Sequence, residues 1–270
     1  MLRVRPPAVA GSFYPQDPGT LAREVARLLD EAPRSTKLAS RPKALIVPHA
    51  GYVYSGATAA LAYACLRPWA SKIQKVVLLG PAHRVAFRGL ALPDVDLLAT
   101  PLGTLPVDHD CLQSLLALSQ VHVNAAAHAM EHALEVQLPF LQVVLEGCSA
   151  IPMVVGDADT TDVAQVLESV WGGPETLIVI SSDLSHYLPY AQARSADHQT
   201  LQSVLALRPD LTSKQACGAI PINGLLRVAQ ILDMQPNILG TCNSGDTSHD
   251  RSRVVGYAAV AFTHAHHATH

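Results

Sequence analysis

The chain contains several mainly apolar runs with the length of buried strands, and polar side chains follow three of them closely. These runs are residues 44–47, 75–79 and 176–180. A short apolar run bounded by turn residues is typical of a parallel strand that is covered on both faces. His49 follows the first run, His83 the second, and Asp183 with His186 the third. Ligands bind at the carboxyl ends of the strands in open α/β sheets, so we expect one shared site there.

Between these runs the apolar spacing changes to that of helices. Asp17 is a predicted helix N-cap with Pro18 in the first helical position, and Ser55 is the predicted N-cap of a second helix. Residues 131–145 have a strong helical pattern that Pro139 should kink or break. Further helices are expected near residues 112–118, 160–171, 190–207 and 221–232, and further strands near 150–155, 237–241 and 254–263.

This alternation of strands and helices predicts the fold class. Strands that alternate with helices form a sheet with helices on both faces. We therefore expect an α/β fold with a largely parallel central sheet. No linker divides the sequence, so residues 1–270 should form a single domain, with 264–270 as a flexible, histidine-rich tail.

Composition excludes several classes of function. The 270 residues are 49% hydrophobic and 15% charged, with a net charge of −3. This balance gives no basic surface for nucleic acid and no polybasic membrane signal, and no stretch is long and apolar enough to span a bilayer. The five cysteines are scattered, without a CxxC pair, which argues against a disulfide framework or a zinc knuckle. With no apolar signal segment at the N-terminus, a cytoplasmic location is expected.

His49 and His83 are the best candidates for metal ligands. Two imidazoles from neighbouring strand ends, together with one carboxylate, would make a non-haem iron site with open positions. The alternative is that both are loop histidines bonded to the backbone. The tail holds four of the thirteen histidines and could bind metal adventitiously.

Asp183 and His186 form a second candidate pair. Asp183 could orient His186, which would then transfer protons near neutral pH. The alternative is that the serines and Asp183 cap a helix and His186 lies on the surface. The spacing does not decide between the two.

Other catalytic motifs are absent or incomplete. Glu131 and His132 begin what looks like a metalloprotease helix, but position 135 is glutamate where that motif needs its second histidine. Glu131 or His132 is therefore expected only to support the site. Neither glycine-containing turn matches a phosphate loop, and no nucleophile elbow of a serine hydrolase is present.

Six motifs, in order along nearly the whole chain, resemble the Memo family, whose bacterial members are often called AmmeMemoRadiSam system protein B. They are AGSFYP (10–15), PHAGY (48–52), GPAH (80–83), EHALEVQLPF (131–140), SSDLSH (181–186) and VGYAA (255–259). The resemblance implies a fold like the catalytic subunit of class III extradiol dioxygenases, which open catechol rings at an iron held by two histidines and a carboxylate. Animal members are linked to receptor signalling, phosphotyrosine-peptide binding, metal-dependent redox activity and binding of copper or iron.

The resemblance also assigns residues. His49 and His83 match the family's two metal-binding histidines, and Asp183 and His186 match two further pocket residues. The third ligand of animal members is a cysteine, and counting back from Tyr257 without gaps puts Thr247 at that position.

The third ligand therefore has to come from elsewhere. Asp246 is the nearest carboxylate and His249 the nearest imidazole, and Cys242 would serve only after a shift of the loop. We place Asp246 first, His249 second and Cys242 last. The alternative for Asp246 is that it only stabilises a turn.

These assignments predict a metal-dependent oxygenase or redox enzyme that acts on a small aromatic or related substrate. Iron(II) would be held by His49, His83 and Asp246, with copper or zinc as alternatives. His186 would be the acid–base group, and Phe13 and Tyr14 would wall the pocket. The competing hypotheses are a scaffold protein that binds an anionic peptide in the same pocket, and an accessory protein of a radical-SAM modification system.

Overall fold

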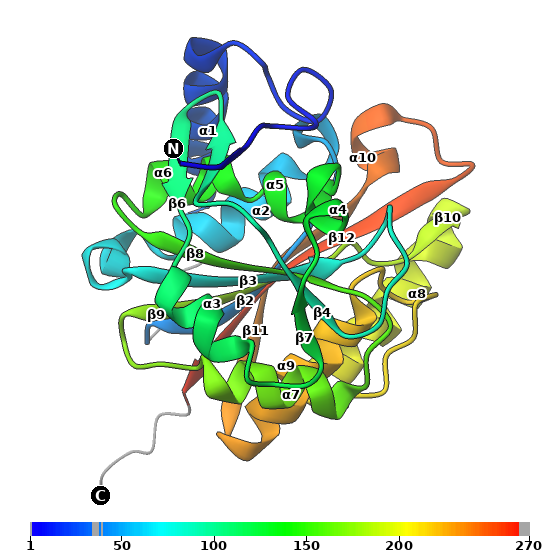
Figure 1. Ribbon diagram of the computed structural model, residues 1–270. Coiled ribbons are helices and arrows are strands. Elements are labelled where there is room, and N and C mark those ends of the chain that lie inside the picture. Colours follow the sequence, from blue (N-terminus) through cyan, green and yellow to red (C-terminus); the bar gives the residue numbers. More distant parts are fainter. Residues whose placement is uncertain (1, 34–37, 39, 265–270) are drawn as a thin grey trace, which may run out of the picture.

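The computed structural model describes residues 2–33, 38 and 40–264, and it is a sheet of nine strands between two layers of helices (Figure 1). Residues 265–270, most of the histidine-rich tail, lie outside the described part. The strand order is β10 (His186–Leu188), β12 (Val254–His264), β2 (Pro42–Val47), β9 (Thr176–Ser181), β3 (Lys75–Pro81), β8 (Ser149–Val155), β4 (Leu90–Leu92) and β7 (Val121–Val123). The ninth strand, β11 (Met234–Asn243), pairs with β12. A small second sheet contains β1 (Val4–Arg5), β5 (Leu97–Thr100) and β6 (Gly103–Pro106).

The centre of the main sheet is parallel, as expected. β2, β9, β3 and β8 are neighbours that run in one direction. Ile46, Ile180 and Leu79 lie level with one another across three of these strands. The segments that follow these strands therefore leave the sheet at the same edge, and these segments carry the candidate site.

Most of the outer strand pairs are antiparallel, so the sheet is more mixed than the sequence suggested; β4 and β7 are a parallel pair. β12 pairs antiparallel with β2, β10 and β11, and β4 pairs antiparallel with β8. Only a short connection separates β11 from β12, and such connections join antiparallel neighbours, because a parallel pair needs a long crossover.

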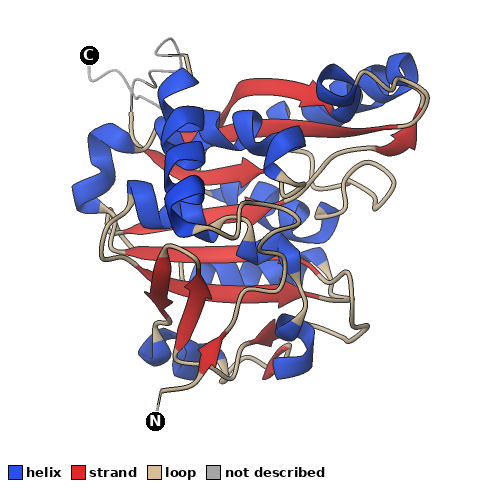
Figure 2. Ribbon diagram, turned by 90° about the horizontal axis from the view of Figure 1, so that it is seen from above, coloured by secondary structure: helices blue, strands red, loops and turns tan. Residues whose placement is uncertain are grey.

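Helices cover both faces, as predicted (Figures 1 and 2). One layer contains α1 (Pro18–Glu31), α2 (Tyr52–Ala64) and α6 (Leu138–Val144), and the other contains α7 (Thr160–Ser169), α8 (Tyr190–Leu205) and α9 (Ala219–Ile231). Shorter helices are α3 (His109–Leu115), α4 (Ala125–Ala129), α5 (His132–Glu135), α10 (Ser244–Ser248) and the 3-10 helix η2 (Arg67–Lys72). No helix in the described residues is long and apolar enough to cross a membrane.

Two of the predicted helix boundaries are confirmed. The Asp17 side chain accepts a hydrogen bond from the Thr20 N–H and caps α1, whose buried residues are Leu21, Val25, Leu28 and Leu29. The pattern over 131–145 is broken into α5 and α6, and Pro139 is the second residue of α6.

The predicted N-cap of α2 is wrong. The helix begins at Tyr52 with Gly51 as its N-cap, and the Ser55 hydroxyl donates to the Ala50 carbonyl instead. The carbonyl of Phe13, in the N-terminal segment, accepts the Tyr52 N–H at 2.7 Å. A tertiary contact therefore satisfies one of the free N–H groups of the first turn, so no capping side chain is needed there.

A buried ion pair fixes the N-terminal segment against α5. The Arg5 guanidinium donates to the Glu135 carboxylate at 2.7 Å, and both side chains are almost fully buried. Glu135 also accepts bonds from the Ala8 and Val9 N–H groups and from the Tyr14 hydroxyl. These bonds offset the cost of burying the carboxylate charge.

Arg5→Met should lower the free energy of unfolding by about 3–5 kcal/mol, because it leaves the Glu135 charge buried without its cation. Urea unfolding measures this change. Arg27→Met is the matched control, since Arg27 forms its ion pairs on the exposed face of α1 and its loss should change stability little. Equal destabilisation by the two substitutions would contradict a structural role for the buried pair.

Candidate metal centre

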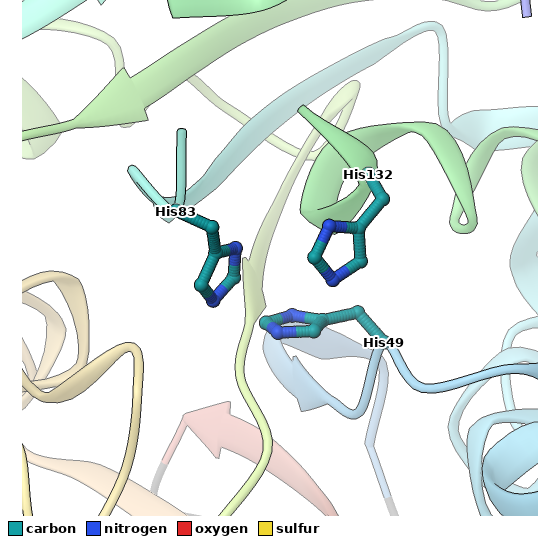
Figure 3. A group of neighbouring side chains, drawn as sticks. All are labelled: His49, His83 and His132. Carbon is teal, nitrogen blue, oxygen red and sulfur yellow. The ribbon is translucent and has the colours of Figure 1, made fainter. Parts of the chain in front are cut away.

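Three histidine side chains converge at the carboxyl edge of the parallel strands (Figure 3). His49 follows β2, His83 follows β3, and His132 is the first residue of α5. Each offers a ligand nitrogen, and these three nitrogens all lie within 4.8 Å of one another. The ring centroids are 4.7–5.4 Å apart. The set combines the two histidines expected as ligands with one that was expected only to support the site.

Hydrogen bonds around His49 determine which of its ring nitrogens is free. The Ser181 hydroxyl donates to the Ala133 carbonyl at 2.6 Å, so its oxygen is an acceptor for other groups. The Nδ1 of His49 lies 2.9 Å from that oxygen and must therefore carry the proton and donate it. This leaves the lone pair of His49 on Nε2, which is the form that binds a metal ion. The Sγ of Cys217, just before α9, lies 3.3 Å from that nitrogen.

The carboxylate of Glu131 orients His83 in the same way. Its Oε1 accepts the Nδ1–H of His83 at 2.8 Å, and its Oε2 accepts the His83 backbone N–H at 2.7 Å. Oε1 also accepts the Ala133 N–H at the start of α5. Burial alone would raise the pKa of Glu131, but the hydrogen bonds and charge of His83 overcome it and lower the pKa to about 2. The carboxylate is therefore ionised and directs the Nε2 of His83 away from itself.

His132 completes the cluster, and one of its ring nitrogens is unsatisfied. Its Nδ1 is buried and has no hydrogen-bond partner, although the Glu131 Oε1 lies 3.4 Å away. Burial, followed by the charge of His49, lowers the pKa of His132 to about 4, and burial with the charge of His83 lowers the pKa of His49 to about 3. Both rings are thus neutral at pH 7, as metal ligation requires.

These residues fit a transition-metal ion. Neutral imidazoles suit zinc, copper, iron and nickel, whereas calcium and magnesium prefer oxygen ligands. Three protein ligands leave coordination positions open for substrate, as in catalytic zinc sites. The three convergent nitrogens and the carboxylate behind His83 are features that a bound ion would explain.

Asp183 lies beside this centre and supports His49. Its Oδ1 accepts the His49 backbone N–H at 2.8 Å, and its Oδ2 lies 4.0 Å from the His49 Nε2. Burial raises the pKa of Asp183 above its usual value. No helix follows this residue, and β10 begins at His186, so the alternative of a helix cap fails.

His186 is oriented by the backbone and not by Asp183. Its Nδ1 donates to the Leu184 carbonyl at 2.8 Å, which leaves the lone pair on Nε2. A charge on His186 would lower the pKa of Asp183 and of His49, so the ring lies within electrostatic reach of the centre.

Asp246, the predicted third ligand, is not part of the cluster. It belongs to the capping box of α10, where Oδ2 accepts the Asn243 N–H and Oδ1 accepts the Tyr190 hydroxyl proton. The turn alternative thus accounts for its contacts, and the third member of the cluster is His132.

The other residues considered as third metal ligand also lie outside the cluster. Thr247 donates to the Ser244 carbonyl, and Cys242 on β11 lies 2.9 Å from the Thr58 hydroxyl. His249 is exposed at the end of α10 in a left-handed conformation. None of the three belongs to the cluster identified in the described residues.

Phe13 and Tyr14 were predicted to line the pocket, and only Phe13 lies beside the histidine cluster. The ring of Phe13 lies 4.8 Å from that of His132, beside the cluster. Tyr14 is buried, and its hydroxyl donates to Glu135. Tyr14 therefore holds α5, which carries His132, while Phe13 offers an apolar surface next to the candidate metal.

Sequence analysis missed Ser181 and Gln137. Ser181 ends β9 and accepts from both His49 and Gln137. Gln137 occupies the break between α5 and α6 and also donates to the Pro48 carbonyl. Both residues stand in motifs noted in the sequence, 131–140 and 181–186, but the sequence did not indicate that their side chains meet.

Glu131→Gln should lower metal affinity by about 10–100-fold while the protein stays folded, because an amide oxygen cannot replace both carboxylate acceptors of His83. The background for this titration is full-length protein with four alanine substitutions in the tail, at His264, His266, His267 and His270. Exposed Glu146→Gln is the matched control. Wild-type affinity in the Glu131 variant would show that the carboxylate does not organise the centre.

Comparison with known proteins agrees with the motifs. A family profile described as "Memo-like protein" matches residues 5–261. A "MEMO1 family protein" of Aquifex aeolicus is 35% identical over 97% of this chain and all of its own length, and one of Ignicoccus hospitalis is 36% identical over 96% and 98%. An uncharacterised protein, JW3007 from Escherichia coli K12, shares the fold with a TM-score of 0.55 and 14% identity, over 82% of this chain and 99% of its own. The chain belongs to the Memo family.

Proposed function

We propose that this protein is a metal-dependent redox enzyme that holds iron(II) on His49, His83 and His132 and acts on a small aromatic substrate. The observation that carries the proposal is the convergence of three imidazole nitrogens, all within 4.8 Å of one another. An ion bound there would supply electron transfer and open coordination positions for substrate.

The charge of the ligand set favours an anionic substrate. Three neutral imidazoles cancel none of the charge of a divalent ion, and the ionised Glu131 carboxylate is already paired with His83. A catecholate or another phenolate would supply the missing negative charge. The ring of Phe13, beside His132, would provide an apolar contact for an aromatic substrate.

His186 is the proposed base for the substrate hydroxyl. The Leu184 carbonyl holds the proton of His186 on Nδ1, so its Nε2 can accept one. The nearby Asp183 would stabilise the imidazolium that forms, because a charge on either group favours a charge on the other. This proton transfer would convert a bound catechol into the anion that the centre requires.

His49→Ala, His83→Ala and His132→Ala should each weaken iron binding by more than the 10–100-fold typical of a supporting partner. Asp246→Ala should leave it unchanged, because both Asp246 oxygens bond other groups of the protein. Elemental analysis and calorimetric titration in the tail-substituted background measure the change. Retained binding in the His132 variant together with loss in the Asp246 variant would restore the carboxylate as third ligand.

His186→Ala should keep the metal but reduce dioxygen uptake with catechol by about 10²–10⁴-fold. His109→Ala, an exposed histidine on α3, is the control. Loss of metal would make His186 a ligand instead. If the iron-loaded wild-type protein binds catechol or an anionic peptide but consumes no oxygen, the scaffold hypothesis replaces the enzyme.

A further inference from the structure

A buried carboxylate on α8 lies next to the segment that carries His186, and the proton transfer proposed above does not use it. The side chain belongs to Asp197, which is only 8% exposed. Its Oδ1 accepts the backbone N–H of Ser185, the residue before His186, at 2.9 Å. None of the ion pairs between described residues includes Asp197. Burying a carboxylate without a cation is costly, so its position calls for a physical explanation.

Residues 184–188, here called the strap, are clamped onto the end of β12. The Leu184 N–H donates to the Gly256 carbonyl at 2.8 Å, and the Gly256 N–H donates to the Ser185 carbonyl at 2.9 Å. These two bonds leave the Ser185 N–H, which the carboxylate of Asp197 accepts. Asp197 is therefore the side chain that completes the clamp, from the helix on the other side of the strap.

The strap needs such a clamp because its backbone turns sharply after His186. Tyr187 has a φ of 60°, in the left-handed region that a non-glycine residue adopts only where its surroundings hold it. The carbonyl that fixes the ring of His186 belongs to Leu184, on the same strap. The direction of the His186 Nε2 thus depends on how firmly the strap is held.

The charge of Asp197 also acts on His186. A Cβ at Gly256 would lie 1.9 Å from the Oδ2 of Asp197, so only glycine at that position lets the carboxylate approach β12. Burial there raises the pKa of Asp197, and the Ser185 N–H and a charge on His186 lower it. Such an interaction is mutual, so the ionised carboxylate favours the charged form of the imidazole.

On its other side the carboxylate borders a cavity of about 510 Å³ along α8 and β11. The other titratable or charged side chains that line this cavity are Tyr190, Arg194, His198, Cys242, Asp246 and Tyr257. Asp246 is held by the capping box of α10, and Arg194 lies over the ring of Tyr190. It is the charge of His186, on the strap, that lowers the pKa of Asp197.

We propose that Asp197 is a positioning residue for His186. It fixes the strap through the Ser185 N–H, and its negative charge stabilises the imidazolium that forms when the ring takes a proton from the substrate. In that step the O–H bond of the substrate breaks, an N–H bond forms at the His186 Nε2, and nothing is oxidised. The inference rests on the role of base proposed for His186. It adds a second carboxylate to Asp183, which accepts the backbone N–H of His49 instead.

Two substitutions separate the hydrogen bond from the charge. The amide oxygen of Asp197→Asn still accepts the Ser185 N–H but carries no charge, whereas Asp197→Ala removes both. Arg194→Gln is the matched control, because it removes a charge from the same helix and cavity without a contact to the strap. In the tail-substituted, full-length protein, hydrogen exchange of the Ser185 amide should be faster in Asp197→Ala and unchanged in the other two variants.

Turnover tests the charge. With iron-loaded protein and catechol, Asp197→Ala should lower kcat for dioxygen uptake by about 10–100-fold and leave KM unchanged, because Asp197 does not touch the substrate. Asp197→Asn should lower kcat less, but the acidic limb of its pH–rate profile should move to lower pH, since the imidazolium loses a favourable charge. Arg194→Gln should not move this limb to lower pH. An unchanged profile in Asp197→Asn would overturn the inference.

A titration of Asp197 tests the inference without turnover. The pKa of Asp197, followed by its carboxyl carbon resonance, should rise in His186→Gln, because the imidazolium no longer favours the carboxylate, and stay the same in His109→Gln. An equal pKa with and without His186, or equal exchange of the Ser185 amide in the parent and Asp197→Ala, would overturn the inference whether or not oxygen is consumed.

The outcomes separate this inference from the proposed function. If both NMR measurements agree with it but the parent consumes no oxygen with catechol, the proposed function fails and the positioning of His186 by Asp197 stands. Circular dichroism checks folding. If Asp197→Ala unfolds, the titration in His186→Gln and the pH–rate profile of Asp197→Asn decide the question.

Discussion

The candidate centre depends on one buried charge, the carboxylate of Glu131. It accepts the ring and backbone N–H groups of His83 and the N–H of Ala133 in the first turn of α5, so it joins the end of β3 to the helix that carries His132. A buried carboxylate is costly unless such bonds satisfy it. The same bonds that hold the charge in place also fix two of the three histidines relative to each other.

One turn further along α5, Glu135 has the corresponding role toward the N-terminus. Its bonds with Arg5, with two backbone N–H groups and with Tyr14 hold residues 5–14 against the helix. That segment in turn places Phe13 beside His132 and satisfies the start of α2 through its carbonyl. The two glutamates of one short helix therefore organise opposite sides of the site, and the parallel strands supply the edge on which it is built.

Sequence patterns predicted the parts of the site that depend on regular structure. His49 and His83 follow continuous apolar strands, and the rule for parallel sheets places their ends together. In the sequence His132 belonged only to an incomplete protease motif. Its helix is too short for a periodic pattern to show which side faces inward, and the bonds of Glu131 and Glu135 to other parts of the chain decide this. Asp246 could not be placed from the sequence, because a carboxylate in a turn suits a metal ion and the capping box that it forms equally well. Cys217 had no signal, because tertiary contacts bring it to His49: its N–H donates to the Asp183 carbonyl, and its sulfur accepts the Asp183 N–H.

The central claim, that His49, His83 and His132 together hold one metal ion, is tested most directly by anomalous diffraction from crystals grown with iron. An anomalous-difference map collected at the iron edge locates the ion without reference to activity. The account predicts one strong peak within bonding distance, about 2.0–2.3 Å, of a ring nitrogen of each histidine. A peak bound to Asp246 or to the tail, with the three rings free, would contradict it.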